Sequence, residues 1–442
     1  MKKNQLLFLL LMQLFFACKK PNFDKVLHDP ELYRTTVKKL NDIVLENNFP
    51  PVVASRNYTY ANIAAYEVIA KGDTANYKSL AGQLTGLKAI PSVAKGKEVD
   101  YQFAALLAFC QVGNAVTFPE GSMDQYVAEL KTRAKEAGLP SDVFDSSVEY
   151  ADTVAKRILK WSKADHYPQT RSASKYTVKQ EDGRWIPTPP MYASALEPHW
   201  GEIRPMVLDS ASQLIPANPP VFNVKDKKST FYQALMQVKN IVDSLTVEQK
   251  HVADFWDDNA FKLNVIGHAM FATKKFSPAG HWMNIAGIAT RNSKSDFNKT
   301  VCVYTKTAIG IFDGFINCWY LKYKFNYVRP ETVIKKYFNA DWKPYIQTPP
   351  FPEYTSGHAV ISSAAAEVLT SFYGDKFNYT DNSESEFGID SLSFKSFREA
   401  AASASISRVY GGIHYKNSCK VGTAEGQEIG QIVIKKLKMN LK

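Results

Sequence analysis

The sequence predicts an all-α protein. Two stretches before residue 163 carry apolar side chains at intervals of three or four residues, the first of them at i, i+3, i+4, i+7, which is the pattern of helices that bury one face. No strand-like alternation of useful length appears along the chain. The chain has 442 residues, of which 45% are hydrophobic, so it is large and apolar enough to form a core in two or three average domains.

The first 17 residues have the features of an export signal. Lys2 and Lys3 precede an apolar run from Leu6 to Phe16, which is too short to span a bilayer. Cys18 follows this run in a context that resembles the lipid-attachment site of bacterial lipoproteins. We therefore predict a signal peptide over residues 1–17 and an exported protein that a lipid on Cys18 anchors to a bacterial membrane. The alternative is an ordinary cleaved signal with a chance cysteine.

The charge and the remaining cysteines limit which partners and metal sites the sequence can predict. The net charge is +11, but no basic run or nucleic-acid motif concentrates it, so we predict no nucleic-acid partner and expect the charge to attract small anions. Four cysteines beyond Cys18 allow three full disulfide pairings, and the sequence does not choose among them. No Cys/His spacing suggests zinc. The four are Cys110, Cys302, Cys318 and Cys419.

Helices are predicted from Pro30 to about Ser162. Proline and glycine break the chain after the first apolar stripe and before the second. Both stripes are interpreted as the core-facing sides of packed helices, not as cofactor sites. The first stripe is Phe103, Leu106, Leu107 and Cys110, and the second is Phe144, Val148, Ala151, Ala155 and Ile158.

A long connection from about Lys163 to Asn223 follows, and nine prolines interrupt any helix in it. Trp185, Tyr192 and Trp200 are interleaved with the prolines, and this aromatic content predicts an ordered segment. So long a connection is usually functional or disordered. Two interpretations are open: it covers the mouth of a site, or it is a packed crossover between two helical halves.

Helices resume at Thr230. Thr246 and Gln249 have the spacing of a capping box, which predicts a helix that runs through Trp256. Asp257 and Asp258 end this helix; either could pair with an arginine of a site, but a solvated helix end is the favoured interpretation. Four further helices are predicted over Val301–Tyr320, Ala359–Leu369, Ala400–Arg408 and Thr423–Leu437.

Two other features of the sequence are interpreted as having no role in ligand binding. His268 and His281 lie in runs that are predicted to be helical and are taken as core or surface histidines. The acidic segment Asp375–Asp390 lacks the spacing of an EF-hand and is predicted to be a solvated loop.

Three short blocks in the last quarter of the chain are predicted to form one anion site. The first block runs from Lys322 to Arg329-Pro330, the second is Phe351-Pro-Glu-Tyr-Thr-Ser-Gly-His358, and the third runs from Ser407-Arg408 to His414. Guanidinium groups bind two anion oxygens at once, and an ammonium adds a point charge. The blocks supply both, and this set suits a tetrahedral oxyanion such as phosphate or vanadate.

The second block also predicts a helix start. Thr355 or Ser356 can cap a helix that begins near Gly357, where free N–H groups point at an anion and glycine lets the backbone approach closely. His358 and His414 add imidazole nitrogens, which serve as nucleophile, metal ligand or acid/base near neutral pH.

Together the blocks resemble the signature of the vanadium haloperoxidase and type 2 phosphatidic acid phosphatase superfamily. The first and third blocks keep the family's internal spacings, and the second keeps Ser-Gly-His with Thr355 in place of proline. The family usually has an aspartate four residues after its last histidine. Here Ser418 stands at that position, so a backbone carbonyl, Asn417 or a more distant acid must hold the other nitrogen of His414.

The resemblance implies two helical bundles, with the site in the second. Residues 1–17 would be the signal peptide, residues 18–222 the N-terminal helical half with the crossover, and residues 223–442 the C-terminal bundle that carries the site. It also implies a haloperoxidase of the bacterial lipoprotein type, nearest to the bacterial vanadium iodoperoxidases, whose cofactor is vanadate and whose partners are hydrogen peroxide, a halide ion and a possible organic acceptor.

The resemblance also assigns roles to residues. His414 would bind vanadium, and His358 would act as acid/base. The oxygens of vanadate would be held by Lys322, Arg329, Ser356, Gly357 and Arg408. Trp319 and Phe351 resemble aromatic positions that flank vanadate in haloperoxidases.

Two alternatives remain open at this point. A type 2 acid phosphatase would use the same cradle, with His414 attacking phosphorus. A non-enzymatic surface lipoprotein would account for the aromatic content of 13% and the predicted lipid anchor, but not for the three blocks. The aromatic positions and the large N-terminal half favour the peroxidase, and iodide is the preferred halide because it is the easiest to oxidise.

Overall fold

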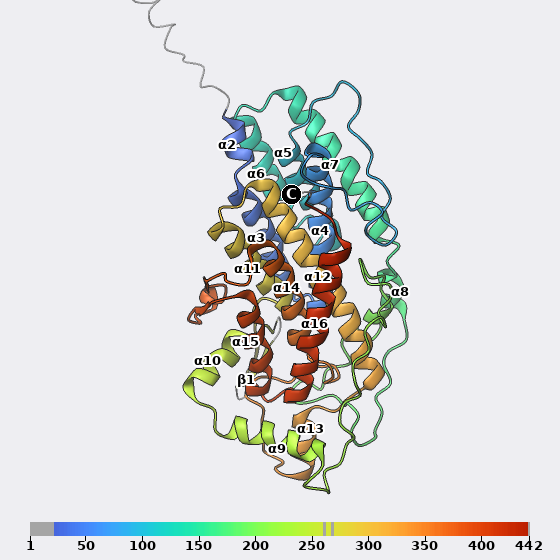
Figure 1. The fold of residues 1–442 in the computed structure, drawn as a ribbon, viewed down its shortest axis with the longest axis vertical. Helices are drawn as coiled ribbons and strands as arrows, with labels where there is room; N and C mark the ends of the chain where they lie inside the picture. Colours follow the sequence, from blue (N-terminus) through green and yellow to red (C-terminus); the bar gives the residue numbers. More distant parts are fainter. Residues whose placement is uncertain (1–21, 260–261, 267–268, 441–442) are drawn as a thin grey trace, which may run out of the picture.

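A computed structural model describes residues 22–259, 262–266 and 269–440. In this part of the chain the fold is mainly helical, with the N-terminal helices at one end of an elongated body and α9 and α13 at the other (Figure 1). The first half contains α2 (Phe23–Leu27), α3 (Pro30–Glu46), α4 (Pro51–Gly72), α5 (Tyr101–Val116), α6 (Asp124–Glu136), α7 (Ser141–Ser162) and α8 (Tyr167–Ser172).

The second half of the chain begins with the short helix η2 (Trp200–Glu202) and is again mainly helical. Its longer elements are α9 (Thr230–Asp243), α10 (Val247–Phe255), α11 (Pro278–Asn292), α12 (Phe297–Phe325), α13 (Pro330–Tyr337), α14 (Gly357–Tyr373), α15 (Phe397–Tyr410) and α16 (Lys416–Lys436).

The predicted core stripes lie where expected. The first stripe is on α5, which begins after Asp100, whose carboxylate accepts a hydrogen bond from the Phe103 N–H at 2.8 Å. The second stripe is on α7, which begins after Pro140. Both stripes are buried apart from the partly exposed Val148. The helical periodicity therefore identified the inward faces of these two helices.

Helix α12 joins the two halves of the chain. It has 29 residues, most of them buried, and it packs against α4 on one side and α14 on another. Asp296 caps its first turn by accepting from the Lys299 N–H at 2.7 Å. At the other end, Asn326 adopts the left-handed conformation (φ 47°) and ends the helix just beyond Lys322. The predicted boundary between residues 222 and 223 stays a prediction.

The proline-rich crossover is ordered, and different parts of it match different interpretations. Trp185 and Trp200 are fully buried in the body of the protein. Met191 and Leu196, together with residues between them, line a cavity instead. The segment is thus both a packed crossover and one wall of a cavity.

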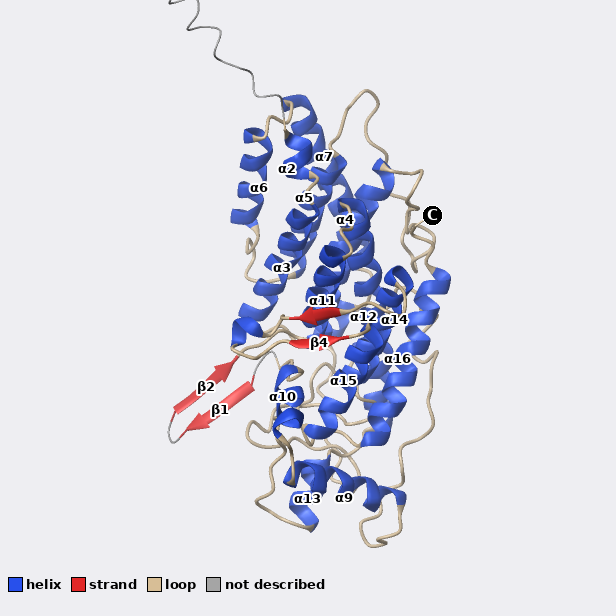
Figure 2. Ribbon diagram, turned by 60° about the vertical axis from the view of Figure 1, so that its left-hand side comes forward, coloured by secondary structure: helices blue, strands red, loops and turns tan. Residues whose placement is uncertain are grey.

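Two antiparallel hairpins interrupt the helices. β1 (Lys262–Ile266) pairs with β2 (Ala269–Thr273) and extends away from the body, and β3 (Tyr379–Asp381) pairs with β4 (Leu392–Phe394) (Figure 2). The prediction of a helical run around residue 268 is therefore wrong, and His268 itself lies outside the described residues. The first hairpin was missed because its strands are only five residues long, too short to separate from a buried helical segment by periodicity.

The four cysteines of the described chain are free thiols, each of them buried. The predicted signal peptide and Cys18 lie outside the described residues. Among the helices that the structure describes, none has an apolar stretch long enough to cross a bilayer.

Candidate active site

The three blocks meet at one place, although up to about a hundred residues separate them. Lys322 lies near the end of α12, Arg329 stands directly before α13, and the second block runs into the start of α14. Arg408 is on the last turn of α15, and His414 lies in the turn to α16. A cavity of about 270 Å³ is lined by residues of most of these segments, among them Trp319, Phe351, Gly357, His358, Arg408 and His414.

Lys322 is fully buried beneath this cavity. Its Nζ donates to the carbonyl oxygens of Pro352 (2.9 Å), Glu353 (3.0 Å) and Thr355 (2.6 Å). Burial lowers the pKa of Lys322 to about 8. Because its three donors are taken by the backbone of the second block, Lys322 shapes this loop and contributes charge, not a free N–H, to the cavity.

Arg329 holds the third block to the second. Its Nε donates to the Phe351 carbonyl at 3.0 Å, and its Nη1 donates to the Ile413 carbonyl at 2.7 Å. The same Nη1 lies 3.1 Å from His414 Nε2. The Nη2 atom is buried and has no hydrogen-bond partner in the described part of the chain. Because the arginine can only donate, His414 Nε2 must present its lone pair.

Glu353 supplies the acid that the sequence did not place. Its Oε1 lies 2.7 Å from His414 Nδ1 and accepts from the Tyr415 N–H at 3.0 Å. Nδ1 therefore carries the proton and Nε2 is the free ring nitrogen. Of the three options that the sequence left open for orienting His414, the structure selects a distant acid, which comes from within the second block.

The electrostatics of this pair follow from its burial. Burial, together with Arg329 and Lys322, lowers the pKa of His414 well below its ordinary value, whereas burial raises the pKa of Glu353 to about 7. An imidazole held neutral with an unprotonated Nε2 is the form that binds a metal ion or attacks an electrophile.

The N-terminus of α14 points its first residues at the cavity. Ser356 occupies the N-cap position, but its hydroxyl makes no capping hydrogen bond and is buried without a geometric hydrogen-bond partner among the described residues. The Thr355 hydroxyl donates to Glu425 Oε2 at 2.8 Å. The predicted side-chain cap is therefore wrong, although the helix does begin at Gly357 as predicted. A Cβ added to Gly357 would lie 3.5 Å from the Trp319 ring.

Arg408 closes the other side of the cavity and is fixed by its own helix and by α10. Its Nε donates to the Ser407 hydroxyl at 2.9 Å, and its Nη2 donates to the Trp256 carbonyl. Burial lowers its pKa, and Asp257 and Asp258 oppose this shift. Both aspartates are only 4% exposed, so the favoured prediction of a solvated helix end is wrong. The α10 terminus packs on the site, which no local pattern reveals.

His358 lines the cavity one residue after Gly357. Its Nε2 lies 3.3 Å from Asp258 Oδ2. Burial and the neighbouring Arg408 lower the pKa of His358 to about 4, although Asp258 acts in the opposite direction. The ring is therefore neutral near pH 7 and can accept a proton.

The two predicted aromatic residues are brought together. The ring centroids of Trp319 and Phe351 are 4.8 Å apart. Lys322 Nζ lies 5.0 Å from the centroid of the Phe351 ring, and the Arg329 guanidinium also lies 5.0 Å from it. The rings thus form an apolar wall with cations behind it. The cavity is also lined by Phe49 and Pro50 from the first half of the chain and by Leu196 from the crossover.

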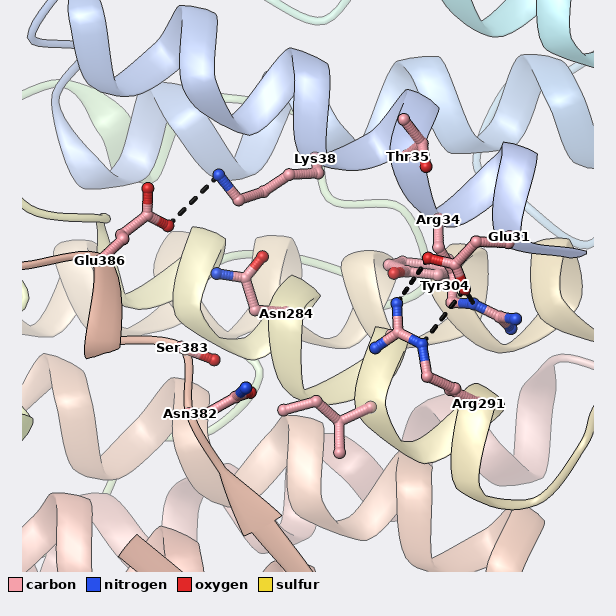
Figure 3. A pocket seen from close by; sticks show the side chains of 12 residues that line it. Glu31, Arg34, Thr35, Lys38, Asn284, Arg291, Tyr304, Asn382, Ser383 and Glu386 are labelled. Carbon is pink, nitrogen blue, oxygen red and sulfur yellow. Dashed lines mark hydrogen bonds and ion pairs between the residues drawn. The ribbon is translucent and has the colours of Figure 1, made fainter. Parts of the chain in front are cut away.

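A second cavity, of about 280 Å³, differs in its charge (Figure 3). It lies between α3 and α11 and contains three cations. Arg34 and Arg291 both contact Glu31, at 2.8 and 2.6 Å, and Lys38 Nζ is 3.3 Å from Glu386. Because Glu31 and Glu386 pair these three cations, none of them is left unpaired for an anion.

We expect Glu353→Gln to weaken vanadate binding by roughly 10–100-fold, the usual effect of removing the partner of a metal-binding histidine. An amide at this position can donate to Nδ1 and force the proton onto Nε2. Equilibrium dialysis of the apo-protein against vanadate, read by elemental analysis, measures the change.

Glu425→Gln is the matched control for this variant. Glu425 is also buried, burial raises its pKa to about 8, and it contacts Thr355 instead of His414. Its amide variant should bind vanadate within about threefold of the wild type. Equal affinity in Glu353→Gln and the wild type would show that Glu353 does not orient the ligand.

The described residues fit a tetrahedral oxyanion. At the cavity lie the N-terminus of α14, which begins with Gly357, and His414, whose unprotonated Nε2 contacts Arg329 Nη1; Arg329 Nη2 is buried nearby without a hydrogen-bond partner among the described residues. An ion of the size of phosphate or vanadate would satisfy these groups. The fold and the site thus define the class of the protein as a helical protein whose buried cations and His414 could hold an oxyanion.

Comparison with solved structures identifies the family. The crystal structure of the first bacterial vanadium-dependent iodoperoxidase matches with a TM-score of 0.88 and 42% sequence identity, and the alignment covers 93% of this chain and 97% of that one. The chain belongs to the vanadium-dependent haloperoxidase family. A family model, the VCPO second helical-bundle domain, matches residues 338–442.

More distant structures share the fold. A bacterial vanadium-dependent chloroperoxidase matches in its holo form with a TM-score of 0.65 at 16% identity, and in its apo form with 0.66 at 17%. These alignments cover 88% of this chain and 92% and 94% of the respective partners. No curated protein matches the chain by sequence. The predicted fold class and family are confirmed.

Proposed function

We propose that this protein is a vanadate-dependent peroxidase that uses hydrogen peroxide to oxidise iodide to hypoiodous acid. The observation that carries the proposal is the unprotonated His414 Nε2, which Glu353 and Arg329 hold in that form at the edge of the cavity. The overall reaction consumes one proton, because hydrogen peroxide, iodide and a proton yield hypoiodous acid and water. Membership of the haloperoxidase family favours this reaction over the phosphatase and non-enzymatic alternatives.

Each predicted site residue has a place in this function. His414 would bind vanadium through Nε2, and Arg329, Ser356, Gly357 and Arg408 would hold the oxygens. Lys322 would add charge from below, since its donors hold the second block. When bound, vanadate supplies a Lewis acid that makes peroxide oxygen electrophilic. The buried cations would stabilise negative charge on the oxygens in this water-poor cavity.

His358 would move the proton. It is neutral near pH 7 and lines the cavity, so it can accept a proton from hydrogen peroxide and return it when water leaves. Trp319 and Phe351 would give the halide an apolar surface. A large, weakly hydrated anion such as iodide loses less hydration there than chloride does. This argument and the 42% identical iodoperoxidase favour iodide.

The decisive experiment is halide-dependent consumption of peroxide by the purified apo-protein, with and without vanadate. We expect activity with iodide only after vanadate is added. A large excess of phosphate during loading should delay activation, because phosphate has the same tetrahedral shape and meets the same Arg329 and Arg408. Sodium nitrate at the same ionic strength, which supplies no halide, is the control for ionic strength. Vanadate-independent activity, or full activation against excess phosphate, would contradict the proposal.

We propose further that a lipid on Cys18 anchors the exported protein to a bacterial membrane. The Cys18→Ser variant should move from the membrane fraction to the soluble fraction, because an acyl chain supplies the apolar burial that retains it. Immunoblots of fractions prepared in high salt without detergent measure this. Lys20→Ser, which keeps the cysteine, should stay with the membranes. If Cys18→Ser also stays there, the anchor is not this cysteine.

A further inference from the structure

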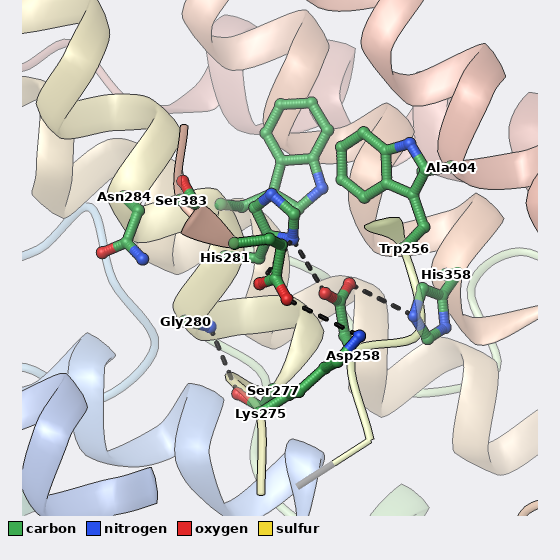
Figure 4. Close-up of polar contacts among 12 residues, drawn as sticks. Trp256, Asp258, Lys275, Ser277, Gly280, His281, Asn284, His358, Ser383 and Ala404 are labelled. Carbon is green, nitrogen blue, oxygen red and sulfur yellow. Dashed lines mark hydrogen bonds and ion pairs between the residues drawn. The ribbon is translucent and has the colours of Figure 1, made fainter. Parts of the chain in front are cut away.

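A group of buried charged residues lies directly behind His358 (Figure 4). We call it the acid–histidine cluster: Asp258, which follows α10, His281 of α11, Asp381 of β3, and Glu384 just before η3 (Ser385–Phe387). All four are buried, with His281, Asp381 and Glu384 fully inaccessible. The acidic segment that contains Asp381 and Glu384 is thus not the solvated loop that the sequence predicted.

His281 is the centre of the acid–histidine cluster. Its Nδ1 lies 2.8 Å from Asp258 Oδ1 and 3.7 Å from Glu384 Oε1, and its Nε2 lies 3.0 Å from Asp381 Oδ2. The imidazole stacks on the Trp256 ring with 4.6 Å between centroids. As predicted, His281 is a core histidine. Its ring is held in place by a carboxylate at each nitrogen as well as by packing.

The geometry sets the protonation of His281. Carboxylates accept hydrogen bonds, so both ring nitrogens donate, and the ring is an imidazolium without a lone pair for a metal ion. Burial opposes this charge, but Asp258 and Asp381 raise the pKa of His281 well above its ordinary value. Burial in turn acts against ionisation of Asp258, yet His281 and His358 lower the pKa of that carboxyl. Burial raises the pKa of Glu384 to about 8, which leaves it neutral at pH 7.

Asp258 connects His281 to the cavity. One carboxylate oxygen contacts His281, and the other lies 3.3 Å from His358 Nε2. Both of these atoms are buried, and their contact has the distance of an ion pair without the geometry of a full hydrogen bond; the His358 side chain as a whole is 17% exposed. A carboxylate at Nε2 holds the proton on that nitrogen, so Nδ1 keeps a lone pair.

We propose that His281 is a positioning residue for the peroxidase reaction, which keeps Asp258 ionised so that Asp258 orients His358 and selects its tautomer. The proposal rests on the proposed function, because it assigns His358 the proton transfer. His281 touches neither substrate nor cofactor and acts only through Asp258.

The charges that face Asp258 and His358 support these roles for His281 and Asp258. Arg408 of α15 lies on the cavity side, next to Asp257. Lys275, on the segment before α11, lies 3.9 Å from Glu384 and donates to the Asp254 carbonyl, so it balances the far end of the cluster. His281 is therefore the cation in direct contact with the buried side of Asp258. Without it, the buried carboxyl would take up a proton and stop accepting from His358.

The test is a double-mutant cycle with His281→Gln, His358→Ala and their combination. Glutamine keeps an N–H for hydrogen bonding but has no charge. In the wild-type background, His281→Gln should lower kcat for iodide oxidation by roughly 10–100-fold, as for other residues that orient a functional histidine. In the His358→Ala background the same change should alter kcat by less than about twofold. Vanadium content after gel filtration should equal that of the wild type in the single variant.

The cycle separates positioning from general damage. A packing defect would lower kcat to the same extent in both backgrounds, and that outcome would overturn the proposal. If His281→Gln does not fold, Asp381→Asn takes its place, because it keeps the ring and removes one carboxylate; a kcat loss that again depends on His358 is required. If the wild type itself lacks vanadate-dependent iodide oxidation, the proposed function fails as well. If the wild type is active but His281→Gln lowers kcat equally in both backgrounds, the proposed function stands and only this inference is wrong.

Discussion

The His414→Ala variant should lose its vanadium on gel filtration and at least ~10³-fold of its turnover. Removing one electrostatic contact to a reacting group already costs roughly 10²–10³-fold, and this change removes the nitrogen that would bind vanadium. The cationic cradle of Arg329 and Arg408 would remain and could still attract vanadate. It has no fixed nitrogen, however, and Glu353 would lose the partner that its Oε1 contacts at 2.7 Å. Elemental analysis of the eluted protein and a peroxide-consumption assay give the two readouts.

His199→Ala is a suitable control for this experiment. His199 contacts Glu202 and the Ser174 carbonyl on the surface of the crossover, away from the cavity. Its variant should retain vanadium and turnover. Equal vanadium retention by the wild type and the His414→Ala variant would remove His414 as the ligand, and with it the main support for the proposed function.

The His358→Ala variant should bind vanadium as the wild type does, but turn over roughly 10²–10⁴-fold more slowly, the usual effect of removing a general acid/base. The contacts of His414 with Arg329 and Glu353 do not involve His358, so they stay intact. The lost function is proton transfer by a ring whose pKa burial and Arg408 lower to about 4. Single-turnover rates with saturating peroxide, together with vanadium content, measure both properties.

The two histidine variants are informative as a pair. The assigned roles require that the His414→Ala variant loses vanadium and that the His358→Ala variant retains vanadium but turns over slowly. If the His358→Ala variant loses vanadium as well, His358 contributes to binding and its acid/base role is incomplete. If its turnover is unchanged, another group, such as solvent in the cavity, transfers the proton.

Local patterns predicted the parts of the protein that depend on neighbours in the chain. The stripes on α5 and α7 follow from helical spacing, and the capping box of α10 is present, with Thr246 and Gln249 each bonding to the other's backbone. The short hairpins and the capping of α14 were not predictable in the same way. The Thr355 hydroxyl turns to Glu425 on a different helix, a contact 70 residues away that no local pattern contains.

The sequence by itself determined which residues form the anion site. The three blocks combine lysine, arginine, a helix start and histidine, a set of residue types that anion binding and proton transfer together require. The tertiary structure alone decided which acid orients His414, and that Asp258 and His281 stand behind His358. Glu353 is 61 residues from His414 in the chain, and Asp258 is 23 residues from His281. These residues come together only because of how the helices pack in three dimensions. Burial then shifts their pKa values, an effect that their positions in the sequence do not indicate.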